Sequence, residues 1–181
     1  MKLAIVATLT AAALGATLVA APAAQAEQRR YADPADAAAS LTDIRAVKVD
    51  HGARTLAVTV RFTDLRRRSD GGPASLTIGI DTRSSRPGAE FRLVSGLQEG
   101  TDYQLMRVRH GRVVGEPLTC GHRVRLDFAH NRLRFVGSRT CLGSPARARI
   151  AVLMRDEWDA SHPITDWLGA RRSYTAWLAS S

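Results

Sequence analysis

Two cysteines frame one short stretch of this chain, Cys120 to Cys141, and the pattern between them restricts the fold more than any other feature. Apolar and polar residues alternate on both sides of a turn at residues 129–132, as in a β-hairpin with one buried face. With His130 and Asn131 at the tip, a four-residue loop sets the register. The predicted pairs are Phe128 with Leu133, Leu126 with Phe135, Val124 with Gly137 and Cys120 with Cys141. We therefore expect a hairpin whose open end is closed by a Cys120–Cys141 disulfide.

Short alternating segments punctuated by turn residues continue on both sides of this hairpin. The clearest is the stretch TLAVTVRF at residues 55–62. The other expected strands, besides the two arms of the hairpin, cover residues 43–49, 75–81, 90–94, 103–109, 112–116, 147–154 and 173–178. About nine to ten short strands, with no helical apolar stripe after residue 26, predict an antiparallel β-sandwich of the jelly-roll type. A closed β-barrel is the alternative.

The first 26 residues have the pattern of an export signal. A charged start at Lys2 precedes an almost wholly apolar run, and Ala24-Gln25-Ala26 forms a small-x-small cleavage site. A retained membrane anchor is the alternative, and no second run of spanning length follows. The expected organisation is a signal peptide at 1–26, a flexible lead-in at 27–40 and a single sandwich domain at 41–181. A secreted, extracellular and monomeric protein is expected, and two cysteines in an exported chain most often pair.

The chain is strongly basic, with 26 Lys and Arg against 17 Asp and Glu and a formal charge of +9. Strong basicity fits nucleic acid or an anionic polymer, whereas a GC-rich coding bias would also give abundant Arg and almost no Lys. The positions expected to face away from the core of the Cys hairpin are Arg123, Arg125, Asp127, Arg132, Arg134 and Val136. In the predicted register Asp127 faces Arg134.

A second basic group could extend this surface. Arg107, Arg109 and Arg112 belong to the preceding hairpin around His110-Gly111, and neighbouring hairpins would form one basic stripe. Such a stripe suits a glycan or an anionic cell-envelope polymer. The stripe has no interleaved aromatic residues for base stacking, which argues against nucleic acid.

Three sets of residues are candidates for ligand chemistry. Trp158 and Trp167 lie in an acidic segment expected to be a loop, where exposed indoles could stack on sugar rings. Asp33, Asp36 and Asp43 form an acidic group that could hold a structural Ca²⁺, although the sequence favours ordinary turn and strand-start roles for Asp36 and Asp43. The chain has no G-x-S-x-G, H-E-x-x-H or Cys-cluster motif, so no catalytic residue and no other cofactor is assigned.

A family likeness accompanies these patterns. The D-x-x-D group before Asp43-Ile44, the TLAVTVRF strand, SLTIGID ending at Asp81, and PGAEF together resemble the first half of DOMON-like sandwiches, which include family 9 carbohydrate-binding modules. The later VRLDFAHNRLRF, SRTCLGSP and ARIAVLM segments are similar to exported actinobacterial proteins of unassigned function. The resemblance implies a sandwich with a binding role, in some relatives with structural Ca²⁺.

These observations predict a secreted, non-catalytic module that binds a glycan or an anionic cell-envelope polymer. Two alternatives remain open. One is a secreted hydrolase with an active site built from loops, and the other is a structural or inhibitory secreted protein. Fold-level likeness by itself does not decide among them.

Overall fold

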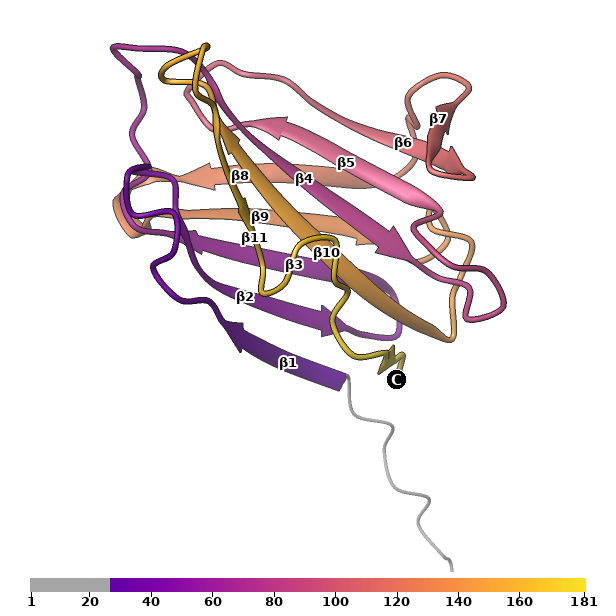
Figure 1. Ribbon diagram of the computed structural model, residues 1–181. Coiled ribbons are helices and arrows are strands. Elements are labelled where there is room, and N and C mark those ends of the chain that lie inside the picture. The colour runs from indigo at the N-terminus through magenta and orange to yellow at the C-terminus, as the bar shows by residue number, and fades with distance from the viewer. Residues whose placement is uncertain (1–26) are drawn as a thin grey trace, which may run out of the picture.

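The computed structural model describes residues 27–181, so the predicted signal peptide at 1–26 lies outside the described part of the chain. The described residues form two antiparallel sheets that pack face to face (Figure 1). The five-stranded sheet has the order β1 (Glu27–Ala32), β2 (Ile44–His51), β3 (Thr55–Phe62), β9 (Arg132–Ser138) and β8 (His122–Asp127). The two sheets do not close into a barrel, and the predicted all-β antiparallel sandwich is confirmed.

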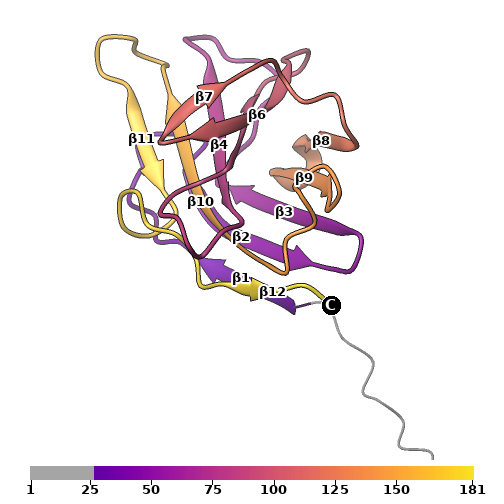
Figure 2. The ribbon, with the colours of Figure 1, turned by 90° about the vertical axis from the view of Figure 1, so that its right-hand side faces the viewer.

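The second sheet has seven strands. Its order is β11 (Ile164–Trp167), β10 (Arg147–Asp156), β4 (Ala74–Asp81), β5 (Phe91–Gly96), β6 (Tyr103–Arg109) and β7 (Arg112–Val114), and β12 (Leu178–Ala179) also pairs with β10. Figure 2 shows the two sheets from the side. Within residues 27–181 no helix of the length and apolarity needed for a membrane span is found.

The core lies between the sheets and follows from the alternation of the strands. The fully buried large side chains are Phe62, Phe135, Ile44, Leu56, Leu76, Ile78, Ile80, Leu93, Leu97, Leu105, Leu133 and Leu142. In β3, for example, Leu56, Val58, Val60 and Phe62 face inward. Because side chains on a strand alternate between faces, the intervening residues of the five-stranded sheet lie on its outer face.

The Cys hairpin forms, but its register is shifted by two residues from the prediction. Val124 pairs with Phe135 and Leu126 with Leu133. The same residues still face the core, because a shift by two preserves the faces of a strand. The disulfide between Cys120 and Cys141 is present, with Cα atoms 5.5 Å apart. The cysteines meet because the chain turns back after β9, where Leu142 N–H bonds to Ser138 O at 3.3 Å.

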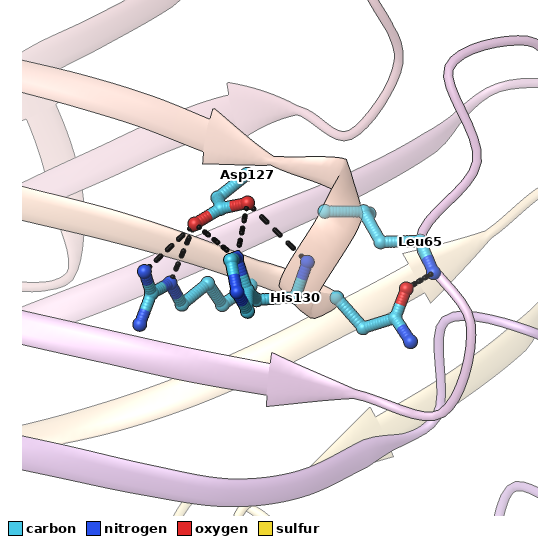
Figure 3. Close-up of polar contacts among 5 residues, drawn as sticks. Leu65, Asp127 and His130 are labelled. Atoms are coloured by element: carbon cyan, nitrogen blue, oxygen red, sulfur yellow. Dashed lines mark hydrogen bonds and ion pairs between the residues drawn. The ribbon is translucent and has the colours of Figure 1, made fainter.

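The tip of the hairpin explains the shift (Figure 3). Phe128–His130 form one turn of 3-10 helix, and Asp127 accepts a hydrogen bond from His130 N. Asn131 follows in the left-handed conformation, with φ of 51° and ψ of 50°. Its side-chain oxygen accepts Leu65 N at 3.0 Å, which ties the tip to the loop after β3. Asp and Asn at these two places thus set the loop at residues 128–131 rather than 129–132.

Three other expectations differ from the structure. Residues 27–40, expected to be a flexible lead-in, contain strand β1, which pairs with β2 over six residues. The Trp-bearing segment 156–169, expected to be loop, contains β11, and Trp167 lies in that strand. Of the expected last strand at 173–178, only Leu178 lies in a strand, the two-residue β12 that pairs with β10.

Candidate functional site

The outer face of the five-stranded sheet carries a row of basic residues that crosses all five strands. Arg30 of β1 lies opposite Lys48 of β2, which lies opposite Thr59 of β3. Thr59 in turn lies opposite Arg134 of β9, and Arg134 lies opposite Arg125 of β8. Four of the five positions in this row are therefore basic.

The rows on either side add further basic residues. One row consists of Ala32, Ala46, Arg61, Arg132 and Asp127, and the other of Gln28, Asp50, Ala57, Val136 and Arg123. We call these three rows together the basic face. It holds seven basic residues and two acidic ones, which leaves a formal excess of five positive charges.

Few of these charges are compensated. Arg132 pairs with Asp127 at 2.8 Å, and the His130 ring bonds to the same carboxylate at 3.0 Å (Figure 3). These donors, His130 first, hold the pKa of Asp127 below its ordinary value. No other basic residue of the face has an ion-pair partner within residues 27–181. Like charges opposed across strands repel, so the free face attracts anions.

A hollow of about 530 Å³ lies at one end of the basic face. Three arginines, Arg30, Arg45 and Arg61, line it. One acidic residue, Asp43, lines it as well, together with Phe62 and other parts of the loop between β1 and β2. Arg45 is held by Asp43 at 3.2 Å, whereas Arg30 and Arg61 have no such partner in the described chain. The hollow can therefore receive an anionic group from a ligand that lies along the face.

The predicted basic stripe across the two hairpins is wrong in one respect. Arg107, Arg109 and Arg112 lie in the β6–β7 hairpin of the seven-stranded sheet, whereas β8 and β9 belong to the other sheet. The neighbours of the Cys hairpin are β3 and, beyond it, β2 and β1. The predicted pair of Asp127 with Arg134 is also replaced, because Asp127 lies opposite Arg132.

The predicted acidic group is rearranged as well. One carboxylate oxygen from each of Asp33, Asp36 and Asp166 lies within 4.8 Å of the others. Asp43 is not part of this group, because its carboxylate accepts Ala37 N at 3.1 Å and Thr63 Oγ1 at 3.1 Å and so holds the loop. Asp166 comes from β11, far away in the sequence. It was missed because its segment was expected to be a loop.

Burial makes this acidic group electrostatically unusual. Asp33 and Asp166 are 6% and 3% exposed, whereas Asp36 is exposed. Burial, reinforced by the charges of Asp33, Asp36 and Asp43, raises the pKa of Asp166 to about 6. Burial likewise raises the pKa of Asp33. We refer to Asp33, Asp36 and Asp166 as the acidic cluster.

The two candidate tryptophans lie in different settings. Trp158 follows β10, is 55% exposed and borders a hollow of about 190 Å³ together with Leu41, Arg68 and Asp70. Its indole rests on Gly71, where an added Cβ would lie 2.5 Å from Trp158 Cδ2. Trp167 is half-buried on β11 opposite Leu153 and does not line this hollow. The two indoles therefore do not share this hollow.

A Ser–His–Asp group also occurs, in the turn after Trp158. Ser161 Oγ lies 2.9 Å from His162 Nδ1, and Asp159 Oδ2 lies 3.1 Å from the same nitrogen. A catalytic triad needs the Ser and the carboxylate on opposite ring nitrogens. His162 and Asp159 are also 84% and 56% exposed, so this turn has neither the geometry nor the shelter of a hydrolase site.

None of the protein-family models, curated proteins or solved structures with which the chain was compared matches it. The fold and the surfaces described above are therefore the basis for any functional assignment.

Proposed function

We propose that this protein is an exported, non-catalytic binding module that holds an anionic cell-envelope polymer on its basic face. The observation that carries the proposal is the row Arg30, Lys48, Thr59, Arg134 and Arg125, in which basic residues on four strands meet no carboxylate of the described chain. A disulfide and an export-signal pattern support an extracellular setting for the module.

The arrangement suits a polymer with regularly repeated negative charges. Neighbouring strands are about 4.8 Å apart and outward residues on one strand about 6.7 Å apart, so basic residues at adjacent positions, such as Arg125 and Arg134, present cations at spacings of this order. Arginine offers a planar fork of donors that matches phosphate oxygens. The preferred ligand is therefore a flexible phosphodiester-linked polyol or sugar polymer that lies along the row, with one end at the hollow beside Arg30 and Arg61.

The chemistry of the face favours such a polymer over nucleic acid. No residue in the three rows is aromatic, so bases would find no stacking platform. The resemblance to DOMON-like sandwiches, which include carbohydrate-binding modules, also accords with an envelope ligand, and membership of that group is part of the proposal.

A second candidate function is recognition of a neutral glycan at the hollow beside Trp158. The observation that favours it is the exposed indole next to Arg68, Asp70 and Gln98, since sugars combine stacking on aromatic rings with hydrogen bonds to polar side chains. The residues that line this hollow do not belong to the basic face. Substitutions can therefore test the two candidate functions separately.

Retention on immobilised polymers tests the proposal. The unchanged protein is passed at low salt over a polyol-phosphate polymer, over a neutral glycan and over single-stranded DNA. The row variant carries Lys48→Gln, Arg125→Gln and Arg134→Gln. The matched control carries Arg86→Gln, Arg109→Gln and Arg112→Gln, which removes the same charge from exposed positions elsewhere.

The proposal expects retention on the polyol-phosphate polymer that the row variant loses and the control variant keeps. No retention of the unchanged protein, or equal loss in both variants, would count against it. Tighter retention on DNA would assign the face to nucleic acid. Retention on the neutral glycan that disappears in Trp158→Ala would instead support the second candidate.

A further inference from the structure

The acidic cluster joins the edges of the two sheets. Asp33 follows β1, the edge strand of the five-stranded sheet, and Asp166 lies on β11, the edge strand of the other sheet. Each carboxylate accepts a hydrogen bond from a backbone N–H in or next to a strand of the other sheet. Asp33 Oδ1 accepts Gly169 N, just after β11, at 2.7 Å, and Asp166 Oδ2 accepts Ile44 N, the first residue of β2, at 2.6 Å.

The second oxygen of each carboxylate has no hydrogen-bond partner within residues 27–181. Asp33 Oδ2 and Asp166 Oδ1 are both fully buried, in side chains that are more than nine-tenths buried. A buried carboxylate oxygen without a donor is costly, and two beside a third carboxylate repel each other. Each carboxylate is therefore held by one oxygen and offers the other, which is how proteins orient metal ligands.

We propose that Asp33, Asp36 and Asp166 bind one Ca²⁺ ion, which fastens the open edges of the two sheets to each other. Oxygen atoms are the ligands that Ca²⁺ prefers, with bonds of about 2.3–2.6 Å. Two oxygens on opposite sides of such an ion are about 4.6–5.2 Å apart, whereas across Mg²⁺ they are about 4.0–4.2 Å apart. The ligand oxygens, which all lie within 4.8 Å of one another, are close enough to bind one Ca²⁺ ion together.

The site is independent of the proposed function, although both involve the loop between β1 and β2. That loop carries Asp36 and also lines the hollows beside Arg30 and beside Trp158. An ion at the acidic cluster balances the buried charge, and it holds this loop in place without itself contacting a polymer.

Thermal unfolding with and without Ca²⁺, together with calorimetric titration of Ca²⁺ itself, tests the site. The unchanged protein should show one heat of binding and a Tm raised by about 5–10 °C at a hundred times Kd. Asp36→Asn should keep the fold, because Asp36 is exposed, and should weaken Ca²⁺ binding at least about tenfold. Asp102→Asn, at an exposed position elsewhere, is the control and should bind as the unchanged protein does.

Asp166→Asn separates an ion site from a merely structural cluster. The Asn oxygen keeps the bond to Ile44 N, and the change removes one negative charge from the buried cluster, so without Ca²⁺ the Tm of this variant should equal or exceed that of the unchanged protein. With Ca²⁺ it should show no rise. Absence of a Ca²⁺-dependent shift in the unchanged protein, an equal shift in Asp166→Asn, or an equal response to Mg²⁺ would overturn the assignment.

Discussion

Arg125 of β8 and Arg134 of β9 lie directly opposite each other on the solvent side of the five-stranded sheet. Like charges in such positions destabilise a sheet by several tenths of a kcal/mol, up to about 1 kcal/mol. A sequence selected for stability alone would place an acidic residue at one of these positions. The pair is therefore the kind of unfavourable arrangement that functional surfaces keep.

The pair gives the first prediction. Arg125→Glu should form a cross-strand ion pair with Arg134 and stabilise the protein by about 0.5–1 kcal/mol, which raises Tm by about 1–4 °C. The same change should weaken binding to an anionic polymer, because it reverses a charge in the central row. Differential scanning calorimetry and polymer retention measure the two effects. A fall in Tm, or binding that is unaffected, would contradict the interpretation of the row.

The disulfide gives the second prediction. It closes a loop with a sequence separation of 21 and ties the start of β8 to the turn after β9. In the chain-entropy model such a bridge stabilises by about 3 kcal/mol. Cys120→Ser with Cys141→Ser should lower the denaturant midpoint while circular dichroism keeps the β spectrum, since the core residues of β3 and β9 stay in place. An unchanged midpoint would show that the bridge adds nothing.

The third prediction concerns acid sensitivity. His51 is fully buried at the end of β2, its Nδ1 lies 3.1 Å from Leu178 O, and its Nε2 has no partner in the described chain. Burial lowers the pKa of His51, which the contact with Leu178 O only partly offsets. In the unfolded chain His51 is protonated below about pH 6.5, whereas in the folded protein it stays neutral to a lower pH. The free energy of unfolding therefore decreases as the pH falls below about 6.5.

Comparison of the unchanged protein with His51→Gln checks this. The free energy of unfolding of the variant, relative to the unchanged protein, should increase as the pH is lowered from neutrality through about 6.5. Asp166 acts in the opposite direction, because its raised pKa favours the folded state below about 6. Its contribution cancels when the two proteins are compared at each pH. If the difference in the free energy of unfolding between the two proteins does not depend on pH, His51 does not cause the acid sensitivity.

Much of the fold could be predicted because strands with one buried face have a strict period of two. The residues 55–62 and 103–109 were predicted with the boundaries that the structure has. The register of the Cys hairpin was wrong because Asp127 was not recognised as a cap, and because Asn131 ends the loop in the left-handed conformation instead of standing at its tip. Strand β1 was missed since its sequence, EQRRYA, is polar, and its pairing with β2 is what makes it a strand.

The candidate sites were only partly predictable, for a topological reason. The outward Arg residues of the Cys hairpin were identified, but Arg30, Lys48 and Arg61 join them only because β9 pairs with β3 across the intervening chain. Asp33 and Asp36 were identified, whereas Asp166 reaches them through the meeting of two sheet edges. Arg61, an outward basic residue of the predicted strand 55–62, was the available signal for the wider basic face.

The dependence of polymer affinity on salt tests the central claim most directly. Each cation that neutralises a phosphate of a flexible polyanion contributes about 0.7 to the slope of log K against log salt concentration, measured between about 50 and 200 mM. The row variant with Lys48→Gln, Arg125→Gln and Arg134→Gln should therefore have a slope smaller by about 2 than the unchanged protein. The control with Arg86→Gln, Arg109→Gln and Arg112→Gln should keep the original slope. Equal slopes for the row variant and the unchanged protein would contradict polymer binding on the basic face.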